Sequence, residues 1–163
     1  ANLSLRSDDY TFFELNNVKD TALRSVMIQT IFKAREHEIE ILFEVKDEIE
    51  RLPMNLLDLV RVASVLLNNA VEGAAESTSK SINISLVNLE NEIIFVIQNS
   101  RQSRHMNIEE IYEMGFSTKG KNRGLGLSNV KEIINKYEDI ILETDIETNN
   151  FIQIVRFKRK EIL

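Results

Sequence analysis

The sequence predicts an α+β domain, a two-layer sandwich in which a mixed, mostly antiparallel sheet carries helices on one face. Its expected elements run in the order helix, strand, helix, two strands, helix, two strands, with a long connection before the last helix. This order suits helices gathered on one face of a sheet, whereas a doubly wound parallel sheet needs regular alternation of strand and helix. With 163 residues and 43% hydrophobic content, the chain is about one domain long and can bury a substantial core.

The first half of the chain predicts two helices that flank one strand. Apolar residues at helical spacing begin near Asn17 and continue to Phe32. The run from Ile39 to Val45 is rich in β-branched and aromatic residues and predicts a strand. Asn55 then supplies an N-cap for a long helix from about Leu56 to Glu76.

The second half predicts a hairpin, a long connection, a helix and two further strands. In the second hairpin strand, the two-residue period places Asn99 at the end of an apolar row. Residues 100–123 form a longer connection than compact domains usually contain, and such segments are often functional lids. The expected ranges are 81–89 and 92–99 for the hairpin, 125–137 for the helix, and 140–146 and 151–157 for the last strands.

Composition excludes several classes of function. A net charge of −6 gives no global basic field, so we expect no nucleic-acid partner. Cysteine is absent, which removes disulfides, thiolate metal sites and cysteine nucleophiles. No apolar run reaches the length of a membrane span, and we expect the chain as given to be soluble. Because it starts at Ala1 without a methionine, it reads as a fragment of a longer protein.

A glycine-rich basic segment is the most informative feature of the chain. Four of the five glycines lie between Gly115 and Gly126, beside Lys119, Lys121 and Arg123 and just before an amphipathic helix. Glycine lets the main chain approach an anion closely, and a helix N-terminus adds N–H donors and a favourable dipole. The segment alone therefore predicts either phosphate binding or an exposed basic loop with a glycine-rich turn, with about equal weight.

Two adjacent asparagines, Asn68 and Asn69, interrupt the apolar part of the long helix. Asparagine is a mediocre residue for a helix interior. An amide oxygen can ligate Mg²⁺ without adding charge, which suits a cation that phosphates already neutralise. The alternative for this pair is a structural role, either bonded to the backbone or exposed to solvent.

Together, three segments resemble the nucleotide-binding boxes of the GHKL superfamily: Asn69-Ala70, the strand that ends at Asn99, and Gly124-Leu125-Gly126-Leu127. That superfamily groups sensor histidine kinases with heat-shock chaperones, type II topoisomerases and MutL-type repair proteins. Within it, the chain is most similar to the catalytic ATP-binding domain of histidine kinases, over roughly residues 17–160. Its finer motifs resemble the Agr/Com class, quorum-sensing receptors for secreted peptide pheromones. The resemblance implies the Bergerat ATP-binding fold.

The resemblance also implies roles for individual residues. Asn69 would ligate the Mg²⁺ that bridges the ATP phosphates. Asn99 stands where most relatives have an aspartate that accepts a hydrogen bond from the adenine amino group, and the glycines of that box are missing from this chain. An amide oxygen can accept the same bond more weakly, so we expect adenine selectivity with modest affinity.

The remaining matched residues lie in the expected lid and the second glycine box. They are Phe116 for the lid aromatic residue, Lys119 and Arg123 for contacts to phosphates, and Gly124, Gly126 and Leu127 for the glycine box itself.

No catalytic residue is expected in this fragment. Val65 stands where the hydrolytic branches of the superfamily place a water-activating glutamate, so we expect poor ATP hydrolysis. The phosphoacceptor histidine of the family lies in a helical hairpin upstream of every segment in this chain. His37 is expected to be a solvated residue at a helix end, and His105 an exposed lid residue.

We therefore expect the cytoplasmic catalytic domain of an integral membrane receptor that binds Mg·ATP. Residues 1–16 would be a linker from the missing hairpin, and residues 17–163 the catalytic domain, with the lid at about 100–123. Its partners would be histidine-bearing dimerisation helices and a response regulator; the fragment would be monomeric and the full receptor dimeric. Two alternatives remain open: a serine kinase of the anti-sigma-factor type, and a nucleotide-binding module without catalysis.

Overall fold

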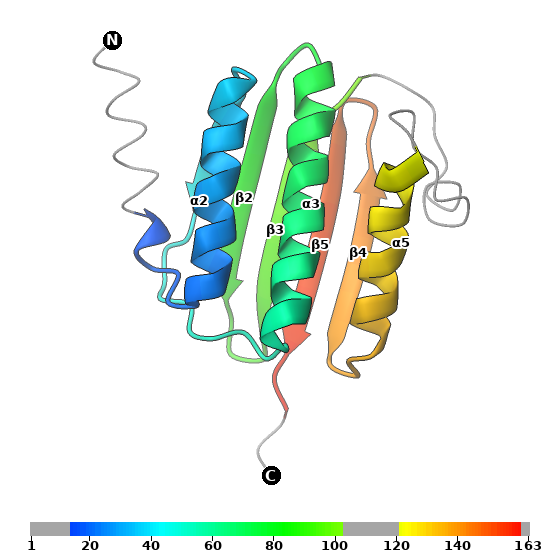
Figure 1. Ribbon diagram of the computed structural model, residues 1–163. Helices are drawn as coiled ribbons and strands as arrows, with labels where there is room; N and C mark the ends of the chain where they lie inside the picture. The colour runs from blue at the N-terminus through cyan, green and yellow to red at the C-terminus, as the bar shows by residue number, and fades with distance from the viewer. Residues whose placement is uncertain (1–13, 103–120, 161–163) are drawn as a thin grey trace.

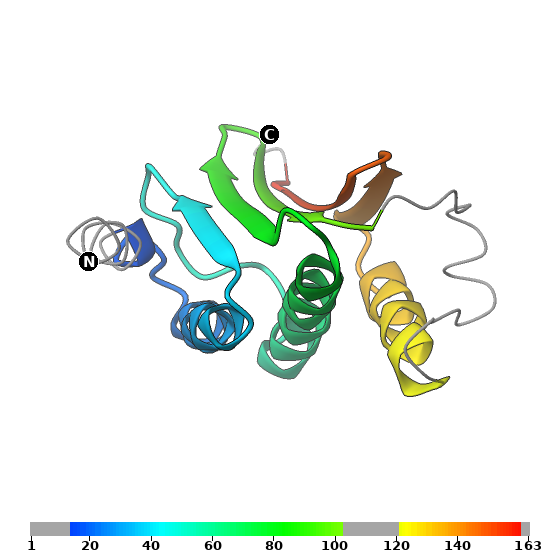
Figure 2. The same ribbon diagram turned by 90° about the horizontal axis from the view of Figure 1, so that it is seen from above.

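The computed structural model describes residues 14–102 and 121–160 of the chain. In this part, a single five-stranded sheet carries three long helices, all on one face (Figure 1, Figure 2). The elements are α2 Thr21–Glu36, β1 Glu40–Glu44, α3 Leu56–Glu76, β2 Ser81–Asn88, β3 Glu92–Ser100, α5 Lys121–Asn135, β4 Ile140–Ile146 and β5 Asn150–Lys158.

The sheet is mixed and mostly antiparallel, which confirms the predicted fold class. Its strand order is β1-β2-β3-β5-β4. The β1–β2 pair is parallel, and the other three pairs are antiparallel. The helix α2 leads into β1, and α3 provides the crossover from β1 to β2, as a parallel pair requires.

Two helices begin at residues other than those predicted. The helix α2 starts at Thr21 rather than near Asn17, because the Asp20 side chain accepts a hydrogen bond from the Leu23 amide and caps the first turn. The helix α5 starts at Lys121 rather than Leu125. Both glycines of the second box therefore lie inside its first turns. A glycine costs a helix only about 1 kcal/mol, which tertiary packing can override.

The long helix α3 has the predicted bounds, and its N-cap is the predicted one. The Asn55 side chain accepts a hydrogen bond from the Leu57 amide at 2.9 Å. The other oxygen of the Asp20 carboxylate, Oδ2, accepts a hydrogen bond from the Leu52 amide at 3.0 Å and so fixes the chain just before Asn55. The start of α2 and the approach to α3 are thereby tied together.

Residues at the start of the described chain pack into the domain. Leu15 is 2% exposed and belongs to the hydrophobic core. Glu14 Oε2 accepts a hydrogen bond from the Val45 amide at 2.8 Å, and Val18 forms a parallel bridge with Ile49. The packing therefore already includes Glu14 and Leu15, ahead of the boundary expected at residue 17.

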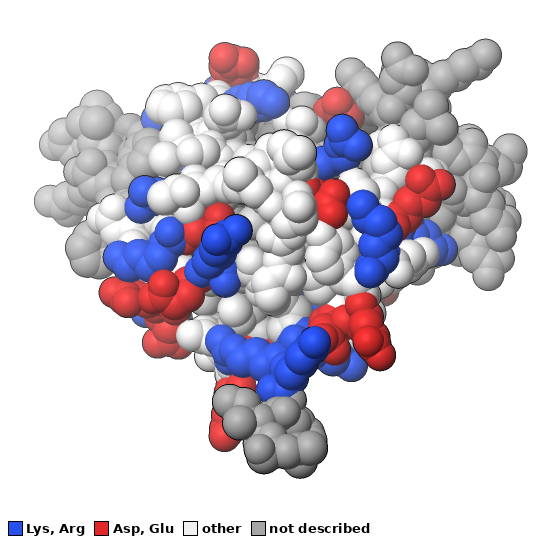
Figure 3. All heavy atoms as spheres, turned by 60° about the horizontal axis from the view of Figure 1, so that its bottom comes forward, with Lys and Arg blue, Asp and Glu red and all other residues white. Residues whose placement is uncertain are grey.

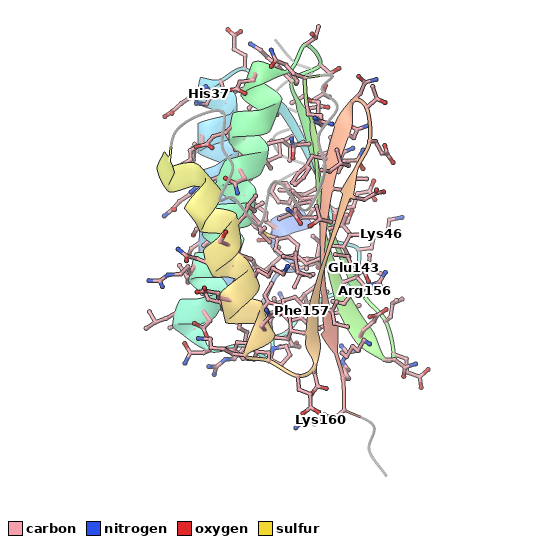
Figure 4. The ribbon with its side chains drawn as sticks, turned by 90° about the vertical axis from the view of Figure 1, so that its right-hand side faces the viewer. His37, Lys46, Glu143, Arg156, Phe157 and Lys160 are labelled. Atoms are coloured by element: carbon pink, nitrogen blue, oxygen red, sulfur yellow. The ribbon has the colours of Figure 1, made fainter. Side chains whose placement is uncertain are left out.

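The two faces of the sheet differ in what they contact. Phe95 and Phe157 point into the core between sheet and helices and are almost fully buried. Figure 4 shows Phe157 directed toward the helices, with Glu143 and Arg156 on the opposite face. There Arg156 bonds to Glu92 at 2.8 Å and to Glu143 at 3.0 Å. The hydrogen bond to Glu143 is the largest cause of the raised pKa of Arg156.

Candidate functional site

One side of α3 contacts both the helix α5 and the strand β3. Val65, Asn69 and Gly73 are spaced four residues apart and therefore share a side of the helix. A Cβ placed on Gly126 of α5 would lie 3.1 Å from Val65 Cγ1. A Cβ placed on Gly73 would lie 2.6 Å from Asn99 Nδ2 on β3. Asn69 therefore lies on α3 between a contact with α5 and a contact with β3. The helix α3 and the strand β3 finish at the same end of the domain (Figure 1).

Asn69 has a polar atom that the described chain leaves unsatisfied. Its Nδ2 is buried and has no hydrogen-bond partner among the described residues. Leaving such a group unpaired costs about 1–3 kcal/mol, so it calls for an explanation. The two ends of an amide exchange places by a half-turn that ordinary structures do not distinguish. In one orientation the amide offers an oxygen to a cation, and in the other a nitrogen to a phosphate oxygen.

The predicted pair of asparagines divides into two different roles. Asn68 faces the other way, and its Oδ1 accepts a hydrogen bond from Lys33 Nζ of α2 at 2.9 Å. Asn68 is therefore a structural link between two helices. Asn69 has an unsatisfied buried Nδ2 that can donate to a phosphate oxygen, and with the amide turned it has the chemistry of a ligand for a hydrated divalent cation such as Mg²⁺. These residues fit the Mg·phosphate group that the resemblance implies.

Asn99 is the second polar residue of the site, and it lies at the end of the apolar row predicted for β3. It is 4% exposed. Its Nδ2 donates a hydrogen bond to the Ser100 carbonyl at 2.8 Å. Because the amide nitrogen is engaged, the Oδ1 atom is the acceptor that this side chain can offer to a ligand.

Sequence reasoning assigned no role to Gly73, although it stands close to both asparagines. A Cβ at this position would require the Asn99 amide to move, because real Cβ atoms do not approach other atoms to 2.6 Å. The signal was present in the sequence. A glycine in a helix interior costs about 1 kcal/mol relative to alanine, and this one follows Asn69 by four residues, on the same side of α3.

The glycine box contributes main chain to the site. Gly124 and Gly126 lie in the first two turns of α5, and the amides of the first turn have no partner within the helix. Leu127 is 8% exposed and belongs to the core, so its side chain packs inside the domain. The predicted residues Phe116 and Lys119, with His105 and most of the expected lid, lie outside the described residues, and so does the side chain of Arg123.

A polar contact at the far ends of the same helices fixes α5 against α3. The Tyr137 hydroxyl donates to Asp58 Oδ2 at 2.5 Å and accepts from the Asn55 amide at 3.1 Å. Lys136 Nζ lies 3.4 Å from the same carboxylate. The hydrogen bond from Tyr137 is the main reason that the pKa of Asp58 is lowered, whereas burial is the main reason that the pKa of Tyr137 is raised. These contacts keep Gly126 close to Val65.

The opposite end of the domain has a different character. A hollow of about 550 Å³ lies there, between the start of β3 at Ile93 and the end of β5 at Phe157. Lysine and arginine side chains alternate with acidic ones over this end, without a large area of one sign (Figure 3). Since Ile93 and Asn99 are at opposite ends of one strand, this hollow is separate from the candidate site.

Three further findings concern the described residues. His37 is the exposed C-cap of α2, as predicted. Residues 14–102 and 121–160 contain no group of three or more His, Cys, Asp or Glu side chains placed to hold a metal. No helix among them is long and apolar enough to cross a membrane.

Comparisons with known proteins agree with this geometry. Residues 54–158 match the family model described as the GHKL domain. The chain is 25% identical over 122 residues to the sensor protein CitS of Bacillus subtilis (strain 168), a match that covers 73% of this chain and 22% of that protein. It therefore spans about a fifth of the length of this relative.

Solved structures share the fold. A nucleotide-free catalytic domain of histidine kinase ThkA matches with a TM-score of 0.69 and 24% identity, over 85% of this chain and 90% of that one. Full-length ShkA in complex with AMPPNP matches with a TM-score of 0.61 and 15% identity, over 87% of this chain and 31% of that one. The chain belongs to the GHKL domain family and has the fold of a histidine kinase catalytic domain.

Proposed function

We propose that this domain binds ATP with Mg²⁺ and transfers the γ-phosphoryl group to a histidine carried by another segment of the same receptor. The observation that carries the proposal is that the side of α3 with Asn69 also has Val65, which faces Gly126 of α5, and Gly73, which faces Asn99 of β3. This arrangement supports a site in which an adenine acceptor, a cation ligand and a phosphate-binding helix start serve one nucleotide. The fold agrees with this, since the similar protein ShkA was solved with the nucleotide analogue AMPPNP.

Each residue has a distinct task in this reaction. Asn99 Oδ1 accepts a hydrogen bond from the adenine amino group, and Asn69 holds the metal–phosphate end. The first amides of α5 bind phosphate oxygens, with Arg123 and the lid residue Lys119 adding positive charge. Mg²⁺, when bound, neutralises charge on the phosphates. The domain therefore contributes position and charge, which is most of what phosphoryl transfer needs.

Val65 is consistent with transfer to a partner rather than to water. Its side chain packs against the core and against Gly126, where an added Cβ would be 3.1 Å away. A valine there cannot accept a proton from water, so the site lacks a general base at that position. ATP should persist in the site until a histidine arrives from outside.

The biological setting is part of the same proposal. We infer a two-component receptor of the Agr/Com type, in which this domain lies on the cytoplasmic side and peptide-pheromone binding controls its access to dimerisation helices and a response regulator. The relative CitS is described as a sensor protein. The motifs Asp58-Leu59-Val60-Arg61 and Asn69-Ala70-Val71-Glu72 support the finer class.

The metal–phosphate role is tested by comparing two neighbouring asparagines. We expect Asn69→Ala to weaken Mg·ATP binding by up to a few kcal/mol, since several donors share the phosphates. Asn68→Ala is the matched control, because the Asn68 side chain is turned toward Lys33 of α2. Calorimetry that gives both variants the wild-type Mg·ATP affinity would remove Asn69 from the site.

Phosphotransfer is tested by adding the missing hairpin in trans. Acid-labile label should appear slowly on its histidine, because the effective concentration of a tether is lost. Label on a serine of a partner protein would instead favour the anti-sigma-type kinase. Binding of ATP without transfer to any acceptor would favour a nucleotide-binding module, which the degenerate box at Asn99 makes the second candidate.

A further inference from the structure

Two serines form a buried pair at the end of the domain that holds Asn99. Ser77 is the C-cap of α3 and Ser100 is the last residue of β3. They are 5% and 4% exposed, and their hydroxyl oxygens lie 2.6 Å apart. Buried hydroxyl groups almost always have hydrogen-bond partners. Since each hydroxyl has a single hydrogen to donate, the direction of the hydrogen bonds can be inferred.

The hydrogens of this pair can be assigned from the number of donors and from the distances. Ser77 Oγ donates to the Ala74 carbonyl at 2.7 Å, which uses its single hydrogen. Ser100 then donates the bond between the serines, because Ser77 Oγ at 2.6 Å is a nearer acceptor for its single hydrogen than the Ser81 carbonyl at 3.3 Å. Ser100 Oγ in turn accepts from the Ser81 amide at 2.9 Å. The result is one directional chain of hydrogen bonds from the start of β2, through the end of β3, to the end of α3, in which each bond strengthens the next.

This chain fixes the group that orients Asn99. The Asn99 Nδ2 donates to the carbonyl of Ser100, the same residue whose hydroxyl is in the chain. An aspartate at position 99 could only accept hydrogen bonds, whichever way it turned. An asparagine can offer either a donor or an acceptor. The choice between the two therefore depends on where the Ser100 carbonyl is held.

We propose that Ser77 and Ser100 are positioning residues that set the base selectivity of the site. They hold the Ser100 carbonyl so that it engages Nδ2 and leaves Oδ1 facing the base. An oxygen there accepts from the 6-amino group of adenine and repels the 6-keto oxygen of hypoxanthine or guanine. The inference rests on the proposed nucleotide site and deepens it by naming what makes that site choose a 6-amino purine.

The test is the ratio of ADP to IDP affinity, measured by calorimetry on the chain and its variants. A side chain that merely supports the fold would weaken both ligands equally, whereas a loosened amide should weaken ADP and admit IDP. We expect the wild type to prefer ADP by at least about tenfold, and Ser100→Ala to lose most of that preference. Ser79→Ala is the control, an exposed serine in the same turn, and it should keep the ratio.

Repeating the serine substitution in an Asn99→Asp variant distinguishes an effect on the orientation of the Asn99 amide from an effect on the stability of the fold. In Asn99→Asp the side chain can only accept, so adding Ser100→Ala should leave the ADP to IDP ratio unchanged. Ser77→Ala provides an independent break in the chain, and circular dichroism checks that each variant is folded. An unchanged ratio in both serine variants overturns the inference, and so does an equal loss in the Asn99→Asp background. If the wild type binds ADP and IDP equally, the inference about base selectivity is refuted but the nucleotide site is not. If the wild type binds neither nucleotide, the proposed nucleotide site itself is refuted.

Discussion

Replacing Gly73 by alanine should displace the Asn99 amide, which destabilises the fold, and should raise the helix propensity of α3, which stabilises it. The new Cβ would lie 2.6 Å from Asn99 Nδ2, about 0.8 Å inside ordinary contact, and 3.5 Å from Asn99 Cγ. The amide must turn or shift, which breaks its buried bond to the Ser100 carbonyl at a cost of about 1–3 kcal/mol. Alanine recovers about 1 kcal/mol of helix propensity in the interior of α3. The net loss of folding free energy should therefore be at most about 2 kcal/mol.

Nucleotide binding has no such compensation. A displaced Asn99 loses its hydrogen bond to the base, and the added methyl group takes space beside it. We expect ADP affinity to fall at least tenfold, about 1.4 kcal/mol, while Tm falls by no more than about 8 °C. Calorimetry with ADP and a thermal scan measure the two effects on one sample.

The control for Gly73→Ala is a substitution on the exposed side of the same helix. Val60→Ala removes a side chain that is 36% exposed and lies outside the hydrophobic core. It should leave ADP affinity unchanged. If Gly73→Ala is folded and binds ADP as tightly as the wild type, Asn99 does not face the nucleotide and the proposed site is misplaced.

Two more predictions concern the helix contact and the isolated chain. The pKa of Asp58 is lowered in the folded state, mainly by the Tyr137 hydroxyl, so this contribution to stability exists above the ordinary pKa of 3.8 and disappears as pH falls through the lower folded value. We expect Tyr137→Phe to have a lower Tm than the wild type at neutral pH, and this difference in Tm should become smaller below pH 3.8. A difference in Tm that stays the same at all pH values would contradict this. The isolated chain should bind ATP, hydrolyse it hardly above background and acquire no label from γ-³²P-ATP. Acid-labile label that His37→Gln abolishes would identify His37 as a phosphoacceptor and overturn the proposal that the acceptor histidine lies in another segment.

The hydrophobic pattern of the sequence was sufficient for most of the fold. The two-residue period of β3 predicted that Asn99 would continue the core-facing row, and it is buried there. The apolar stripe and N-cap of α3 predicted its bounds, because both signals are local. The start of α5 could not be predicted in the same way. Glycines near a helix start read as a turn, whereas packing of Gly126 against Val65 draws them into the helix.

By itself, the sequence determined the order of the elements, the family resemblance and the residue types of the site. Only the tertiary structure decided how those residues are used, because contacts across helices and strands depend on how closely the elements pack. It turned Asn68 toward Lys33 and left Asn69 Nδ2 without a partner among the described residues. It brought Gly73 so close to Asn99 that a single added carbon would displace the amide. The orientation of that amide depends on the Ser100 carbonyl, and no periodicity in the sequence encodes it.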